Sequence, residues 1–157
     1  MDAAPGLLPV EILGLPLDVY QRASEHNDEL LREFALIRED GSDHVPARLL
    51  ALIEELHGRF GAFTEGPTSA LQGALVRGDR DIDLHYEVPA EAADGAVRLG
   101  ALLDEADAFC RSGDLLTLAT VPESLAFRRW FLDEFVSQIA GHPPRSWPAF
   151  MAGRAGG

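Results

Sequence analysis

The chain has 157 residues, enough for one domain with its own hydrophobic core, and its 46% hydrophobic and 25% charged residues are typical of an ordinary globular protein. Its net charge is −13, and all 13 basic residues are Arg because the sequence contains no Lys. Such an acidic chain repels nucleic acid and anionic lipid, and the lack of Lys excludes a Walker A loop and a Schiff-base mechanism.

The chain carries a single cysteine, Cys110, which excludes an internal disulfide and is typical of a reducing compartment. It falls on the apolar side of a predicted helix, so we expect a buried structural thiol. Residues 1–9 lack the basic start and apolar core of a secretory signal, and no apolar run approaches the roughly 20 residues of a membrane span. Together these features predict a cytoplasmic protein.

The N-terminal third of the chain predicts one strand and two helices. After a disordered leader at residues 1–9, Val10–Leu15 has the pattern of a short strand that ends at Pro16, because proline cannot donate to a neighbouring strand. The apolar residues then recur every 3.6 residues, which predicts a helix over about Leu17–Arg38. A polar loop follows, and a second apolar stripe predicts a helix over Pro46–Phe60.

The middle of the chain predicts a short helix, a strand and a longer helix. The short helix begins near Pro67 and ends before Gly78. Asp81–Val88 alternates polar and apolar side chains, which is typical of a strand with one buried and one solvent-facing side. The longer helix places Ala92 and Cys110 on one apolar face.

The last part of the chain predicts a buried strand, a helix and a tail. Leu115–Val121 is uniformly apolar, as a central strand would be, and Glu123–Ile139 is the most hydrophobic predicted helix. Gly141 should end that helix. Residues 142–157, with three prolines and a glycine-rich end, are predicted to be a flexible tail.

The predicted order of elements is β-α-α-α-β-α-β-α. We therefore expect an α+β fold, mostly helical, with a small three-stranded sheet in which the second and third strands form a right-handed parallel crossover. Residues 10–141 would be a single globular domain. The alternative is an all-α bundle with extended connectors.

Candidates for metal or catalytic chemistry are few. Glu54-x-x-His57 and His26-x-x-Glu29 each lie on one helical face, as in di-iron carboxylate bundles, but one pair is reversed and both have charged neighbours, so solvated helix faces explain them better. His85 lies between two acidic residues and is interpreted as a surface histidine. With no G-x-S-x-G or G-x-G-x-x-G pattern either, we predict no enzyme and no catalytic, cofactor-binding or metal-binding residues.

One segment, LTLATVPESLAFRRWFLDEFV at Leu116–Val136, resembles the opening strand and helix of the anti-sigma-factor serine kinases of the GHKL ATPase class. That family binds ATP through an E-x-x-x-N box and later glycine-rich boxes. Here the sole Asn is Asn27, Ala23 stands where the Glu should be, and the glycine-rich boxes are missing. The resemblance therefore implies no kinase or ATPase activity.

The pattern of nearly the whole chain, from LPLDVYQRASEHNDELLREFALI to VPESLAFRRWFLDEFVSQ, is also similar to actinobacterial proteins associated with anti-sigma kinases and their STAS-domain antagonists. This resemblance implies a role in the partner-switching control of stress sigma factors. It assigns no functional residue.

From these observations we expect a non-catalytic regulatory protein that binds a protein partner, an anti-sigma kinase or a STAS-domain protein. The predicted partner surface on the last helix is Phe127, Arg128, Trp130 and Phe131, provided that its aromatic residues lie outside the core. The sequence also leaves open whether the protein forms a homodimer. The alternative is a small-molecule sensor with a pocket between the helices and the sheet, lined by Tyr20, Tyr86, His85 or Arg128.

Overall fold

In the computed structural model, which describes residues 6–37, 45–112 and 120–155, helices predominate over a small sheet. The expected α+β class, mostly helical, is confirmed. The elements in chain order are β1 (Leu7–Pro16), α1 (Leu17–Ile37), α2 (Val45–Phe60), the 3₁₀ helix η2 (Gly61–Thr64), α3 (Glu65–Arg77), β2 (Asp81–Pro89), α4 (Ala92–Ser112), α5 (Pro122–Ile139) and α6 (Trp147–Ala155).

The sheet formed by the described residues has two antiparallel strands, so the expected three-stranded sheet is corrected. The predicted third strand, Leu115–Val121, lies mostly outside the described residues, and its last two residues are described but not in a strand. The reason is visible at Thr120, whose amide donates to the carboxylate of Asp107 rather than to a strand. β1 also begins earlier than expected, at Leu7 within the predicted leader, because it pairs along β2 as far as Pro89.

Both strands present one apolar face to the core. In β2 the predicted alternation is confirmed, with Leu84 and Tyr86 buried and His85 between them exposed. In β1 the pairing register shifts between Ile12 and Leu15, and this irregularity returns Leu15 to the buried face. Gly14 makes the shift possible because its φ is +68°, a conformation that side chains disfavour.

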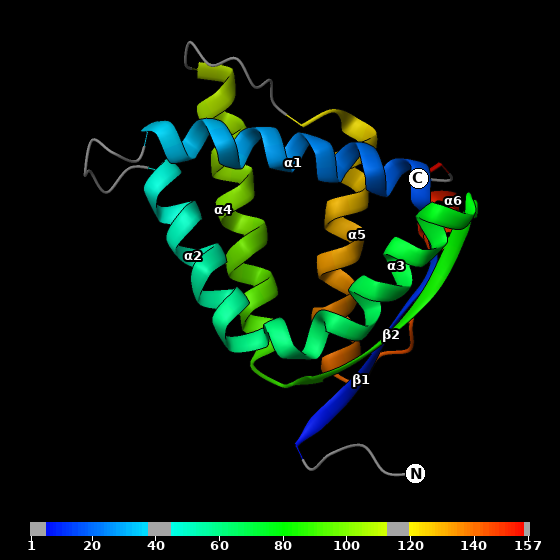
Figure 1. Ribbon diagram of the computed structural model, residues 1–157. Coiled ribbons are helices and arrows are strands. Elements are labelled where there is room, and N and C mark those ends of the chain that lie inside the picture. The colour runs from blue at the N-terminus through cyan, green and yellow to red at the C-terminus, as the bar shows by residue number, and fades with distance from the viewer. Residues whose placement is uncertain (1–5, 38–44, 113–119, 156–157) are drawn as a thin grey trace.

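In Figure 1, helices α1 to α5 lie to one side of the sheet, and α6 lies beside its upper end. α1 runs across the ends of α4 and α5, contacting α2 near one end and α5 near the other. α4 packs between α2 and α5, and α5 packs on β1, with α3 against β2. None of the helices in the described part of the chain has the length and apolar composition needed to cross a membrane.

This arrangement produces two hydrophobic clusters rather than one continuous core. The first cluster lies between the sheet, α3 and α5, and includes Trp130, which has no exposed surface. The second lies between α1, α2 and α4, and is built on Phe34 and Leu49. α4 contributes to both, through Ala96 near its start and Ala106 near its end.

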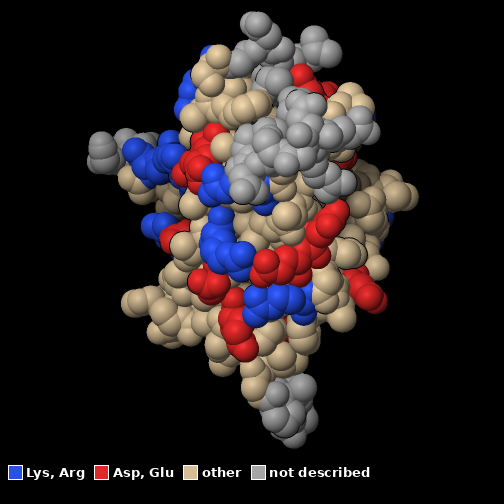
Figure 2. All heavy atoms as spheres, turned by 90° about the vertical axis from the view of Figure 1, so that its left-hand side faces the viewer, with Lys and Arg blue, Asp and Glu red and all other residues tan. Residues whose placement is uncertain are grey.

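The pairing of α2 with α4 has a counterpart in the sequence. Eight residues of α2, RLLALIEE from Arg48, resemble RLGALLDE from Arg98 in α4. Because the two helices run antiparallel, the repeat produces reciprocal ion pairs: Arg48 with Glu105 at 3.2 Å, and Arg98 with Glu55 at 2.8 Å. Figure 2, which views the molecule from the α2 side, shows basic and acidic atoms side by side on this face.

The C-terminal residues, expected to be a flexible tail at 142–157, instead form a docked segment. Arg145 is held to α5 at both main-chain groups: its amide donates to the buried Glu134 carboxylate at 2.8 Å, and its carbonyl accepts from Trp130 Nε1 at 2.8 Å. α6 then places Trp147 against Trp130, with ring centroids 5.5 Å apart. Gly141 ends α5 with a φ of +103°, as predicted. Local composition could not reveal this docking, because the partners lie on α5.

We predict that Trp147→Ala lowers the free energy of unfolding by about 2–3 kcal/mol. This is below the roughly 3–5 kcal/mol for a fully buried aromatic side chain, because Trp147 is half-buried. Urea unfolding followed by circular dichroism measures the change. Ala149→Ser, at an exposed position of the same helix, is the control and should stay within about 0.5 kcal/mol of the parent. Equal stability of the Trp147→Ala variant and the parent would mean that the tail does not dock.

Candidate functional site

The residues predicted to form a partner surface on the last helix do not form one. Trp130 has no exposed surface, Phe127 is 6% exposed, and Phe131 is half-buried with its ring edge-on to Tyr86. The Arg128 side chain is only 10% exposed. The prediction of an exposed patch is therefore wrong. α5 is apolar over most of its circumference because α1, α4, β1 and α6 all pack against it.

Arg128 lies instead at the centre of a polar network between α4, α5 and α1. Its guanidinium group donates to Asp104 at 2.7 Å and to Asp107 at 3.0 Å. Asp107 also accepts hydrogen bonds from the amide and hydroxyl of Thr120, at 3.1 and 2.7 Å. The Thr120 hydroxyl in turn lies 3.3 Å from Nε2 of His26. The network thus ties the residues that precede α5 to α4 and to α1.

The environment of Asp107 favours its ionised form. Burial by itself raises the pKa of this carboxyl group, but the hydrogen bonds from Thr120 and Arg128, together with the Arg128 charge, outweigh burial and leave the pKa below its usual value. The carboxylate is therefore charged, paired and hydrogen-bonded at neutral pH. A buried carboxylate whose oxygens are both hydrogen-bonded in this way is typical of a structural ion pair.

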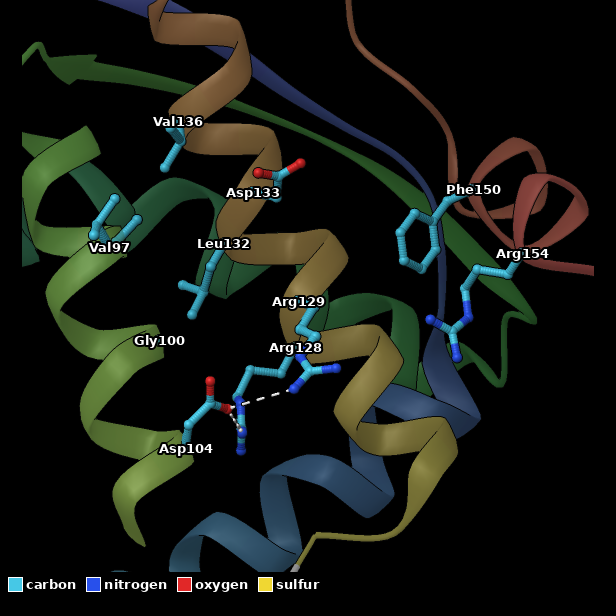
Figure 3. A pocket seen from close by; sticks show the side chains of 11 residues that line it. Val97, Gly100, Asp104, Arg128, Arg129, Leu132, Asp133, Val136, Phe150 and Arg154 are labelled. Atoms are coloured by element: carbon cyan, nitrogen blue, oxygen red, sulfur yellow. Dashed lines mark hydrogen bonds and ion pairs between the residues drawn. The ribbon is translucent and has the colours of Figure 1, made fainter. Parts of the chain in front are cut away.

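Next to this network, a groove of about 420 Å³ runs between α4 and α5 and is bounded by α6 (Figure 3). Val97 of α4, 56% exposed, and the half-buried Leu132 and Val136 of α5 form its apolar floor. Phe150 approaches from α6. Apolar side chains that stay accessible in a concave surface are typical of an interaction site.

The groove exists because α4 and α5 approach each other through small residues. Ala96 and Gly100, four residues apart on α4, face α5, and a Cβ on Gly100 would lie 3.5 Å from Leu132 Cδ1. The four-residue spacing of Ala96 and Gly100 could have predicted this contact from the sequence, but it could not have predicted the groove.

Charged side chains stand on the rim of the groove. Arg129 is 59% exposed and lies 4.0 Å from Asp104, whose carboxylate is already bound more closely by Arg128. Arg154 of α6 lies over the Phe150 ring, 5.8 Å from its centroid. No acidic side chain in the described ranges lies within ion-pair distance of Arg154. The rim therefore carries two cations that are weakly paired within the chain, together with the exposed carboxylate of Asp133.

A second hollow lies on the other flank of the α4–α5 contact, against α2, η2 and β2. Its volume is about 140 Å³, and its walls are apolar, with Phe60, Leu99 and Phe131 half-buried around it. Ala96 and Leu132 line both hollows, so the α4–α5 contact is the wall between them.

The residues expected to line a ligand pocket are placed elsewhere, apart from Arg128, which lines the groove. Tyr86 is 5% exposed, and burial followed by the influence of Tyr20 raises the pKa of its phenol. His85 is exposed on the outer face of β2, where it contacts Glu87. Tyr20, Tyr86 and His85 line neither of the two hollows.

Metal and thiol chemistry find little support in the geometry. Within the residues that the structure describes, no group of three or more His, Cys, Asp or Glu side chains is placed to hold a metal ion. Cys110 is 7% exposed, which confirms the predicted buried thiol. Burial, then the nearby acidic Asp107 and Glu33, raises the pKa of the Cys110 thiol, so it is protonated at neutral pH.

Comparison of the chain with protein-family models, with curated proteins and with solved structures gives no match. The groove and the apolar hollow are therefore interpreted from their own shape and chemistry.

We predict that Asp107→Asn lowers the free energy of unfolding at pH 7 by about 3 kcal/mol. This is the lower end of the cost of breaking a buried ion pair, because Arg128 keeps Asp104 as a partner. The folded pKa of Asp107 is lowered, so its stabilisation is present above the unfolded pKa of about 3.9 and disappears as the pH falls through the folded value. The variant should therefore lose less stability than the parent on acidification below about pH 4. Urea unfolding at several pH values measures both effects.

The matched control is Asp104→Asn, on the same helix and bound to the same Arg128. The Asp104 side chain is 52% exposed, so this change should cost under about 1 kcal/mol. Equal effects of the two substitutions would contradict the structural role of Asp107.

Proposed function

We propose that this is a non-catalytic regulatory protein that binds an amphipathic helix of a protein partner in the groove between α4, α5 and α6. The observation that carries the proposal is the accessible apolar floor: Val97 is 56% exposed in a concave surface of about 420 Å³. A groove of this kind accepts the apolar face of a helix, with residues spaced three or four apart inserted between its walls.

The rim indicates the chemistry of the partner. Arg129 and Arg154 stand at the groove of a chain whose net charge is −13. Arg129 has a 4.0 Å contact with Asp104, which Arg128 binds more closely, and no ion pair joins Arg154 to another described residue. A helix that carries an apolar stripe flanked by Asp or Glu would meet both cations. Acidic side chains on the partner would also be steered away from the rest of this acidic surface and towards the groove.

Catalysis is not part of the proposal. Of the carboxylates at or near the groove, Asp104 and Asp107 are engaged by Arg128 and Thr120. A carboxylate held in this way is a poor general base, because abstracting a proton would break its existing hydrogen bonds. Asp133 also lines the groove but is exposed to solvent.

The pathway we propose is the partner switching of stress sigma factors in the cytoplasm. It rests on the resemblance of Leu116–Val136 to the opening of anti-sigma kinases and on the similarity of the wider pattern to proteins of such systems. The partner would be an anti-sigma kinase or a STAS-domain protein, and α5, which carries part of the resemblance, forms one wall of the groove. The acidic charge disfavours nucleic acid and membranes as partners.

We predict that Val97→Asp weakens partner binding at least about tenfold, because a carboxylate would be desolvated without a partner on the apolar floor. The test uses the anti-sigma kinases and STAS-domain proteins encoded in the same genome, each purified and titrated by isothermal calorimetry. Val76→Asp is the matched control, since Val76 is 88% exposed on α3, away from the groove. It should bind like the parent.

Two outcomes would contradict this proposal. If none of these proteins binds the parent chain, the partner-switching role is wrong. If Val97→Asp and Val76→Asp bind equally well, the groove is not the docking surface. Sedimentation of the chain without a partner tests a third possibility. If the chain self-associates and Val97→Asp abolishes this self-association, a second copy of the chain occupies the groove and the proposed partner does not.

The charged rim leads to a separate prediction. The double substitution Arg129→Glu and Arg154→Glu should reduce the association rate about tenfold at low salt, with a smaller effect at high salt, because rim charges act mainly on the encounter. Stopped-flow or surface-based kinetics measures the rates. Arg32→Glu and Arg111→Glu, both exposed outside the groove, make a control of equal charge. If both double variants lose the same factor in association rate, the effect comes from net charge alone and not from the rim.

A further inference from the structure

The hollow between α2, η2, β2, α4 and α5 lies on the seam between the two hydrophobic clusters. Leu56 and Leu99 on its walls belong to the cluster of α1, α2 and α4, whereas Val88 and Phe131 belong to the cluster of the sheet and α5. The two clusters therefore approach each other here without closing the space between them.

The hollow has almost no means of holding water. Thr64 is the one polar side chain on its walls, and its hydroxyl already donates to the Gly61 carbonyl at 2.9 Å. The other wall residues are aliphatic, aromatic or glycine, and those of α2, α4 and α5 use their main-chain groups in helices. The hollow is open to solvent, but its walls offer water few of the two to four polar partners that an ordered water needs.

We propose that this hollow is a binding site for a small uncharged apolar molecule about the size of one aromatic ring. Its volume is about 140 Å³. An enclosed cavity of about 150 Å³ lined by Leu, Ile and Phe accepts benzene, so a space of this size has room for one aromatic ring. Here the hollow is open to solvent, and its apolar walls supply the contact surface. Phe60 of α2 and Phe131 of α5, both half-buried, line the space and provide flat apolar surfaces for such a guest.

The site shares Ala96 and Leu132 with the partner groove, but its other wall residues belong to it alone. The ligand would contact Leu56, Phe60 and Leu99, none of which lines the groove, and Val97 does not line the hollow. The two sites can therefore be disabled separately, and failure of one proposal leaves the other intact.

The test uses benzene as the probe and the full chain as the protein. At a benzene concentration about fivefold above its Kd, ligand linkage should raise Tm by about 2–4 °C. Methyl NMR locates the site: the methyl groups of Leu56, Val88 and Leu99 should shift, whereas those of Leu49 and Leu71, which are buried elsewhere, should not.

Ala92→Phe should abolish both effects, because Ala92 lines the hollow at the first residue of α4 and a phenyl ring there would occupy the space. The matched control is Ala101→Phe, the same substitution at an exposed position of the same helix, which should bind benzene like the parent. If Ala92→Phe does not fold, Thr64→Leu fills the hollow from η2 and replaces it as the test. Val97→Asp should retain benzene binding.

The proposal is wrong if the parent chain shows neither the rise in Tm nor the localised methyl shifts up to the solubility of benzene. It is equally wrong if the folded filling variant binds benzene as well as the parent does. Loss of binding in the filling variant, with retention in Ala101→Phe, supports it.

Discussion

The carboxylate of Asp107 holds together three segments that are far apart in the chain. It accepts hydrogen bonds from Thr120 and Arg128 while buried on α4, and Thr120 also contacts His26 of α1. Because a buried charge is tolerated only when paired and hydrogen-bonded, these partners have little freedom to separate. The network therefore fixes the N-terminal part of α5 against α4, and the packing of α4 on α5 depends on it.

A second set of polar contacts determines where the chain goes after α5. The Glu134 carboxylate and the Trp130 indole bind the amide and carbonyl of Arg145, so the segment turns back over α5 instead of leaving it. Gln138, also on α5, exchanges two hydrogen bonds with the main chain of Glu11 and so satisfies the free edge of β1. The same face of α5 thus positions both the sheet and α6, and α6 brings Phe150 to the groove.

The α4–α5 contact leaves a hollow on each flank, and their chemistry differs. The groove has an apolar floor and a charged rim, which suits the amphipathic surface of another protein. The smaller hollow is apolar almost throughout, which suits a molecule with nothing to hydrogen-bond. Leu132 lies in the wall that separates them. Close approach through Ala96 and Gly100 is what keeps that wall thin.

Hydrophobic periodicity is a local property, so the sequence by itself determined that Leu17–Ile37 is a helix and that Asp81–Pro89 alternates as a strand, together with the acidic charge and the buried thiol. It did not determine the partners of Thr120 and Arg145, so it did not show that Thr120 bonds to Asp107 or that the segment after α5 docks on that helix. The candidate site was only partly predictable: Arg128 was identified, but as an exposed residue, whereas Val97 and the residues of α6 were not identified at all. A pattern shows which face of a helix is apolar, but only the tertiary structure decides how many neighbours cover it. On α5 the neighbours cover the aromatic residues, and on α4 they leave Val97 exposed.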